Sequence, residues 1–309
     1  MNYKMMGRFI AQILLLEAIF MIPATFISLY CGEYRSVFAF LGTMALLVLI
    51  SGVLWFFCKA AKSNFYATDG MVCVALSWLI LSLAGSLPFL FSGAIPRFID
   101  ALFEIVSGFT TTGASILPAV EGLPKGILYW RSFSHWVGGM GVLVFLLAIV
   151  PSTDQGKGFT MHLLRAESPG PSVGKLVPKM RKTAAILYFL YIILTIADFC
   201  FLLLGGMPAF EALCNAFGTA GTGGFGVRND SFASYSPYLQ NVTTVFMFLF
   251  GVNFSCYYLL MLRQWGAVFK DEELRAYFGI ALCSALLITW NVRGLYGSLG
   301  ETFRHAAFQ

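Results

Sequence analysis

Two short segments of the chain carry residue types that could hold a cation stripped of its water. The first, DALFEIVSGFTTTGAS, starts at Asp100, and the second, EALCNAFGTAGTGGFG, starts at Glu211. Backbone carbonyl oxygens can replace an ion's hydration shell where the chain turns them toward a common axis. Glycine permits the positive φ of such a turn, and threonine adds hydroxyl oxygens and stiffness. Because 13 positions separate Asp100 from Gly113 and Glu211 from Gly224, Gly224 is the preferred counterpart of Gly113, with Gly223 as the alternative.

A short helix is expected directly before each Thr-Gly turn, with its C-terminus directed at the turn. The partial negative charge at that end favours a cation and disfavours an anion. Asp100, Glu104 and Glu211 are expected near the starts of these helices, toward the outer mouth. There they would cap the helices and raise the local concentration of cations.

Long apolar segments flank both turns and indicate a membrane protein. Of the 309 residues, 58% are hydrophobic and only 11% are charged, whereas about a quarter of the residues in a soluble domain are charged. Stretches near the length needed to cross a bilayer are expected at seven places: 9–31, 37–58, 70–91, 127–150, 184–205, 241–262 and 276–292.

The distribution of Lys and Arg predicts the orientation. The first span is too long for a signal peptide and lacks a small-x-small cleavage site, so it is expected to stay as an anchor. With the N-terminus inside, 13 of the 20 basic residues fall on the inner side, and seven fall outside: Arg35, Arg97, Lys125, Arg131, Arg228, Arg293 and Arg304. This bias predicts a cytoplasmic N-terminus and places both Thr-Gly segments outside. The net charge of +5 therefore reflects topology and not nucleic-acid binding.

The fold class predicted is an all-α integral membrane protein built from repeated units of transmembrane helix, pore helix, filter and transmembrane helix. We divide it into an N-terminal transmembrane hairpin (1-66), a first pore repeat (67-155), a basic cytosolic linker (156-183), a second pore repeat (184-268) and the start of a third (269-309). The final ETFRHAAFQ resembles the start of a pore helix. A third Thr-Gly turn is therefore expected beyond Gln309, and the chain is expected to be a C-terminally truncated fragment or an interrupted gene product.

Other chemistry finds little support in the sequence. The seven cysteines are scattered and include no C-x-x-C pair, so inert thiols are expected. There is no P-loop, metal-ligand cluster or catalytic triad in the sequence, so neither an enzyme nor a cofactor is expected.

Arg131 and His135 lie one helical turn apart at the expected outer start of the fourth span. Two interpretations remain open for them. They could meet an acidic group at the pore mouth, or they could form simple interfacial pairs, with Trp130 and Trp136 as belt aromatics.

Further positions also allow two interpretations. Glu17 and Asp198 lie inside spans and are either proton-coupling groups or groups that pair with a neighbouring helix or reach water near an end. Gly138, Gly139 and Gly141 allow close helix packing or a hinge. The basic loop 157–182 docks a cytosolic partner or only enforces topology.

Four stretches together resemble the Trk/Ktr/HKT superfamily of K⁺ transporters, in particular the TrkH-type potassium uptake subunit. They are FEIVSGFTTTGASIL, WRSFSHWVGGMGVLVFLLAIVP, AFGTAGTGGFG with FGVNFSCYYLL, and FRHAAFQ. The resemblance implies four repeats around one pore, one filter glycine in each repeat, and a homodimer in the plasma membrane. It also implies K⁺ as the transported ion and a cytosolic TrkA-like nucleotide-binding regulatory subunit.

The resemblance is carried over residue by residue to the two filter segments present. The implied selectivity filter comprises Thr110, Thr111, Thr112, Gly113, Ala114, Ala220, Gly221, Thr222, Gly223 and Gly224. Of these, K⁺ is implied to contact Thr111, Thr112, Gly113, Thr222 and Gly223. A non-conducting membrane fragment or scaffold that needs a further chain is the alternative. A secondary transporter for another solute would show inverted repeats, whereas these units repeat in parallel.

Overall fold

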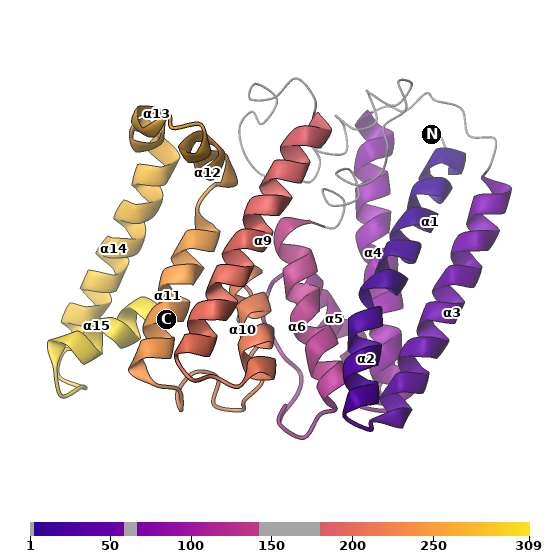
Figure 1. The fold of residues 1–309 in the computed structure, drawn as a ribbon, viewed down its shortest axis with the longest axis horizontal. Helices are drawn as coiled ribbons and strands as arrows, with labels where there is room; N and C mark the ends of the chain where they lie inside the picture. Colours follow the sequence, from indigo (N-terminus) through magenta and orange to yellow (C-terminus); the bar gives the residue numbers. More distant parts are fainter. Residues whose placement is uncertain (1–2, 59–66, 142–179) are drawn as a thin grey trace.

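A computed structural model describes residues 3–58, 67–141 and 180–309, and every regular element in these ranges is an α-helix (Figure 1). In chain order the helices are α1 (Tyr3–Phe20), α2 (Ile22–Tyr30), α3 (Tyr34–Phe57), α4 (Ala67–Ser92), α5 (Phe98–Phe109), α6 (Lys125–Met140), α9 (Met180–Leu204), α10 (Ala209–Ala220), α11 (Pro237–Gly251), α12 (Phe254–Met261), α13 (Trp265–Lys270), α14 (Glu272–Val292) and α15 (Leu299–Phe308).

Five stretches within these ranges are helical, long and apolar enough to cross a membrane: Tyr3–Tyr30, Tyr34–Phe57, Asp69–Ser92, Ala185–Leu204 and Glu272–Val292. They coincide with five of the seven spans predicted from the sequence. The predicted span 127–150 begins within α6, and its residues from 142 onward lie outside the described ranges.

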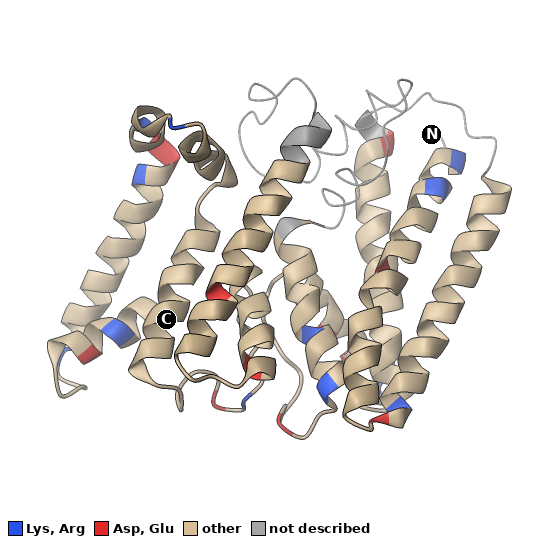
Figure 2. Ribbon diagram, in the orientation of Figure 1, with Lys and Arg blue, Asp and Glu red and all other residues tan. Residues whose placement is uncertain are grey.

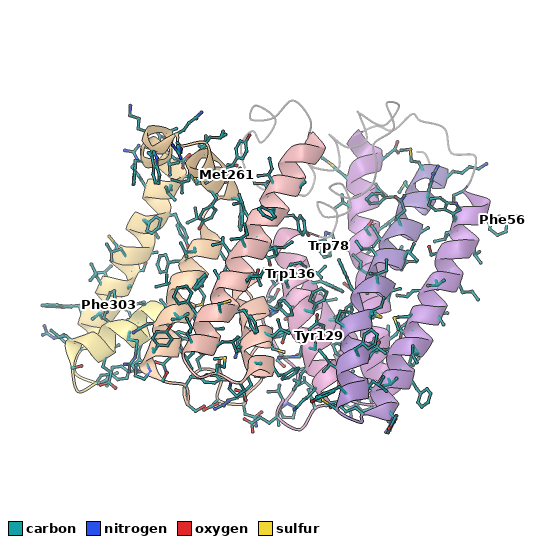
Figure 3. All side chains as sticks on the ribbon, in the orientation of Figure 1. Phe56, Trp78, Tyr129, Trp136, Met261 and Phe303 are labelled. Atoms are coloured by element: carbon teal, nitrogen blue, oxygen red, sulfur yellow. The ribbon has the colours of Figure 1, made fainter. Side chains whose placement is uncertain are left out.

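The membrane character is also visible on the surface of the bundle. Figure 2 shows most of the charged residues gathered at the two ends of the bundle, with few along its length. Phe56 is 73% exposed and projects from the periphery, whereas Tyr129 and Trp136 lie between helices (Figure 3). Apolar side chains that face outward along the length of a bundle are what a lipid environment requires.

The predicted span 241–262 is wrong as a continuous helix. The chain breaks after α11, and α12 leaves at 87°. Asn253 caps α12 by accepting a hydrogen bond from the amide of Ser255. The hydroxyls of Tyr257 and Tyr277 donate to the carbonyls of Leu249 and Phe248, the last turn of α11. The carbonyl of Leu249 also accepts from the amide of Val252. Because the last carbonyls of a helix have no amide in a following turn to accept from, the two tyrosine hydroxyls stabilise the end of α11.

Short helices alternate with the long ones. Helices α5 and α10 each span 12 residues and start at the end of the bundle opposite the N-terminus (Figure 1). Their C-terminal ends point toward the middle of the bundle, and helix α15 enters from the same end. Helices α5 and α10 therefore direct their C-terminal dipole ends at the Thr-Gly segments that follow them, as predicted.

Helix α6 lies at the centre and packs against α2, α5 and α10. Two glycines permit these contacts. A Cβ on Gly138 would overlap the carbonyl oxygen of Phe109, and one on Gly139 would lie 2.8 Å from the Cα of Gly221. The backbone of α6 thus approaches the ends of both short helices, which supports the packing interpretation of these glycines.

We expect Gly138→Ala to destabilise the fold by about 1–3 kcal/mol, because the added methyl group overlaps backbone that cannot move aside. Thermal unfolding of the purified protein in detergent measures this loss. Gly279→Ala is the matched control, since Gly279 lies within α14 with open space around it, and alanine there stabilises a helix by about 0.5–1 kcal/mol. Equal melting temperatures for the two variants would contradict the assignment.

Candidate functional site: the two Thr-Gly segments

The chain leaves α5 and α10 in the same way. The three amides after each helix donate hydrogen bonds back into its last turns, and the donors and acceptors of the second set lie 111 residues after those of the first. The bonds are Thr110 N to Val106 O (2.8 Å), Thr111 N to Gly108 O (3.0 Å) and Thr112 N to Ser107 O (2.9 Å), then Gly221 N to Phe217 O (3.0 Å), Thr222 N to Thr219 O (2.9 Å) and Gly223 N to Gly218 O (3.1 Å).

The backbone angles repeat as well. Thr111 and Thr222 both have φ of 54°, and Gly113 and Gly224 have φ of 74° and 83°. The structure thus places Gly224 at the position equivalent to Gly113. Left-handed backbone at a β-branched residue is unfavourable and persists only where the surroundings impose it. Positive φ at Gly113 and Gly224 agrees with the sequence-based prediction, whereas Gly223 lacks it, and positive φ at the two threonines was not foreseen.

The two segments lie against each other. A Cβ on Gly113 would overlap the carbonyl oxygen of Gly223, so the first turn approaches the backbone of the second as only glycine allows. The hydroxyl of Thr110 donates to the carbonyl of Val106 and lies 2.8 Å from the hydroxyl of Thr112. Two close turns at the C-termini of two short helices form an environment suited to a cation, because carbonyl oxygens and negative dipole ends meet there.

Glu104 was expected toward the outer mouth, and this is wrong. Its side chain is fully buried. It accepts hydrogen bonds from the amide of Ile116 (2.9 Å) and the hydroxyl of Ser115 (2.9 Å), the residues that follow the first turn. It also lies 2.6 Å from the Nε of Arg131 on α6. Glu104 lies on the apolar helix α5, and its carboxylate fixes the returning chain.

Arg131 connects the two segments. Besides Glu104, its guanidinium donates through Nη1 to the carbonyl of Gly226 (3.0 Å) and lies 3.6 Å from the ring centroid of Phe225. Both of these residues follow the second turn. One buried ion pair therefore holds the chain after both Thr-Gly turns. Arg131 does meet an acidic group, but this group is buried inside the bundle and not at the pore mouth as the interpretation had it.

The tryptophans of α6 are not belt aromatics. Trp130 is fully buried, and its Nε1 donates to the carbonyl of Gly85 on α4 (2.9 Å). Trp136 donates to the hydroxyl of Thr195 on α9 (3.1 Å). Both indoles join helices inside the bundle, because α6 is covered on several sides.

The second repeat lacks the buried carboxylate. Asn215 stands 111 residues after Glu104, and its amide donates to the sulfur of Met207. Glu211 instead pairs with Arg228 (2.9 Å) and accepts a hydrogen bond from the Tyr235 hydroxyl. Burial, together with the bond to Glu211, raises the pKa of Tyr235, so this hydroxyl remains a donor.

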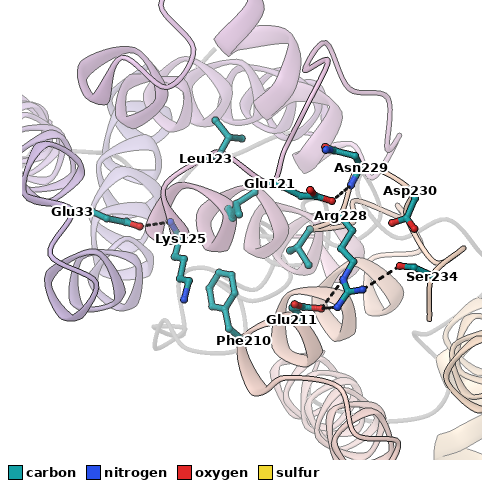
Figure 4. A pocket seen from close by; sticks show the side chains of 12 residues that line it. Glu33, Glu121, Leu123, Lys125, Phe210, Glu211, Arg228, Asn229, Asp230 and Ser234 are labelled. Atoms are coloured by element: carbon teal, nitrogen blue, oxygen red, sulfur yellow. Dashed lines mark hydrogen bonds and ion pairs between the residues drawn. The ribbon is translucent and has the colours of Figure 1, made fainter. Parts of the chain in front are cut away.

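A cleft of about 660 Å³ opens beside Glu211, where α6 and α10 begin (Figure 4). Its lining holds more acidic than basic side chains: Glu33, Glu121, Glu211 and Asp230 against Lys125 and Arg228. Neither short helix has a side-chain cap, and Asp100 and Glu211 instead lie in the first turns. The excess of carboxylates favours cations at this end of the bundle.

Other sequence candidates lie outside this network. Glu17 on α1 and Asp198 on α9 are buried, so neither reaches water at a helix end. All seven cysteines are unpaired. Within the described ranges, no three His, Cys, Asp or Glu side chains are placed to hold a metal ion.

We expect Arg131→Met to destabilise the protein by about 3–5 kcal/mol, because Glu104 would stay buried without its cation. Adding Glu104→Gln should restore part of that loss, since the two groups are coupled. Arg228→Met tests the half-exposed pair with Glu211 and should cost much less. Thermal unfolding of Arg131→Met, Glu104→Gln, the double variant and Arg228→Met measures the coupling, and strictly additive losses in the first three would contradict the assignment.

Comparison with known proteins agrees with this geometry. The family model described as TrkH, a cation transport protein, matches residues 36–292. The Trk system potassium uptake protein TrkH of Salmonella typhimurium is 35% identical over 278 residues, which are 88% of this chain and 57% of that protein. TrkG of Escherichia coli is 33% identical over 301 residues, 95% of this chain and 61% of that protein.

A solved structure also matches. The crystal structure of the potassium transporter TrkH from Vibrio parahaemolyticus superposes with a TM-score of 0.83 at 29% identity, over 100% of this chain and 63% of that one. The chain thus spans about three fifths of the length of these relatives. An all-helical membrane fold, paired Thr-Gly turns and a family match over most of its length lead to one conclusion: the chain belongs to the TrkH family of cation transport proteins.

Proposed function

We propose that this chain supplies the first two filter segments of a K⁺ uptake pore. The observation that carries the proposal is the repeated backbone of the two turns, with the same three hydrogen bonds and the same left-handed positions. Irregular backbone at membrane depth is tolerated where it lines a water-filled path. The relatives named as potassium uptake proteins support K⁺ as the cation.

The filter in this proposal comprises residues 110–114 and 220–224. Carbonyls of Thr111, Thr112 and Gly113, and of Thr222 and Gly223, would contact K⁺. The Thr110 hydroxyl donates to the carbonyl of Val106 and so stabilises the end of α5. A carbonyl keeps two lone pairs and can face an ion while its amide holds the turn.

The wider assembly is also a proposal. The pore repeats are 67-155 and 184-268, the N-terminus is cytoplasmic, and the protein resides in the plasma membrane as a homodimer. A TrkA-like nucleotide-binding regulatory subunit binds at the cytosolic end. The position of the described N-terminus, at the end of the bundle opposite the starts of α5 and α10, supports this orientation (Figure 1). The basic linker 156-183, of which residues 156–179 lie outside the described ranges, is the proposed contact.

The protein should restore growth at low K⁺ to a bacterial strain that lacks its own K⁺ uptake systems. Gly113→Ser should lower the ratio of K⁺ to Na⁺ uptake about tenfold, a difference of about 1.4 kcal/mol. The introduced serine side chain would overlap the Gly223 carbonyl, and the backbone φ of 74° at position 113 disfavours any side chain. Isotope uptake into these cells gives the ratio.

Gly122→Ser serves as the control, because Gly122 lies in a loop with open space around it. The control should keep the ratio of the unmodified protein. An unmodified protein that inserts in the membrane but moves no K⁺ would contradict the proposed function, as would an unchanged ratio in Gly113→Ser.

A further inference from the structure

The ring of Phe225 lies between two side chains of α6. The Arg131 guanidinium carbon is 3.6 Å from the ring centroid, and the His135 ring stacks at 4.0 Å with an interplanar angle of 18°. Two planar groups cannot both lie within 4.0 Å of one centroid on the same face without overlapping. They therefore cover opposite faces, and Arg131 and His135, one helical turn apart, clamp the ring between them.

The clamped ring belongs to the residue directly after Gly224. The equivalent residue in the first segment is Ala114, so only the second segment has a ring for α6 to hold. Phe225 is 3% exposed, and the next residue, Gly226, gives its carbonyl to Arg131. The chain that leaves the second turn is thus fixed at two successive positions by one helix.

His135 also forms the wall behind the second turn. A Cβ on Gly223 would lie within 2.7 Å of three atoms of the imidazole, and a Cβ on Gly221 would lie 2.7 Å from the His135 carbonyl carbon. The histidine is fully buried. The backbone of the second turn therefore rests against the flat imidazole ring and cannot move toward it.

We propose that Arg131 and His135 are positioning residues that act through Phe225 to hold the second filter segment at the spacing that prefers K⁺ to Na⁺. The inference rests on the proposed function and assigns a device to it. Na⁺ is the smaller ion, so a carbonyl ring that can contract accommodates it better. Stacking on both faces of the Phe225 ring opposes that contraction. Any displacement of the ring from its optimal distance to Arg131 and His135 weakens these contacts.

The test uses variants that keep or remove a flat ring. His135→Leu and Phe225→Leu remove one, whereas His135→Phe and Phe225→Tyr retain one. The K⁺ over Na⁺ uptake ratio should fall about tenfold in the two leucine variants, the size of effect that a stacking contact can supply. It should remain near that of the unmodified protein in the ring-retaining variants. The double leucine variant should be no worse than the worse single variant, because both remove the same clamp.

Phe133→Leu is the matched control. Phe133 lies on α6 between the two clamp residues in sequence but packs into the core against Tyr129 and Trp136. This control should lower the melting temperature without moving the uptake ratio. The rise in melting temperature that K⁺ gives over Na⁺, measured on purified protein, provides a second reading for any variant that transports slowly.

The outcomes separate the two proposals. If the unmodified protein shows no preference for K⁺ in either measurement, the proposed function is contradicted. The proposed role of the clamp is then contradicted as well, because that role is to maintain the preference. If it prefers K⁺ and the leucine variants match it, only the clamp is overturned. A loss in His135→Phe as large as in His135→Leu would also overturn it, since stacking would then not be what His135 contributes.

Discussion

The structure depends on one buried ion pair, Glu104 with Arg131. Two turns of irregular backbone must keep their shape inside the helix bundle without the continuous hydrogen bonding of a helix. A carboxylate that accepts from the chain after the first turn, joined to a guanidinium that donates to the chain after the second, solves this with two side chains. Burial is what makes the pair decisive, because neither charge has solvent as an alternative partner.

The two repeats share their backbone but not their supports. The two turns have the same backbone hydrogen bonds and the same left-handed positions. At equivalent positions, however, the second segment has Asn215 where the first has Glu104, and Phe225 where the first has Ala114. Helix α6 follows the first Thr-Gly segment and holds the chain after the second turn as well. The repeats are therefore not independent modules, and a change in α6 reaches both turns.

Local patterns predicted much of this architecture. Apolar length gave five of the spans, and the spacing from Asp100 and Glu211 gave the pairing of Gly113 with Gly224, which the structure places at the same backbone position. The break after Gly251 was missed, because the hydroxyl that donates to the Phe248 carbonyl beside it comes from Tyr277, on another helix. Trp130 was misplaced for a similar reason, since hydropathy cannot tell a lipid-facing indole from one bonded to Gly85.

The sequence by itself determined the class of protein, the repeat and the identity of the turns, because composition, span length and glycine spacing act over short distances along the chain. Only the tertiary structure decided what holds those turns. Glu104 and Arg131 are 27 positions apart, and Arg131 and Gly226 are 95 apart. Such partners meet only when helices pack, and glycines such as Gly138 let α6 come close enough for its side chains to reach both turns.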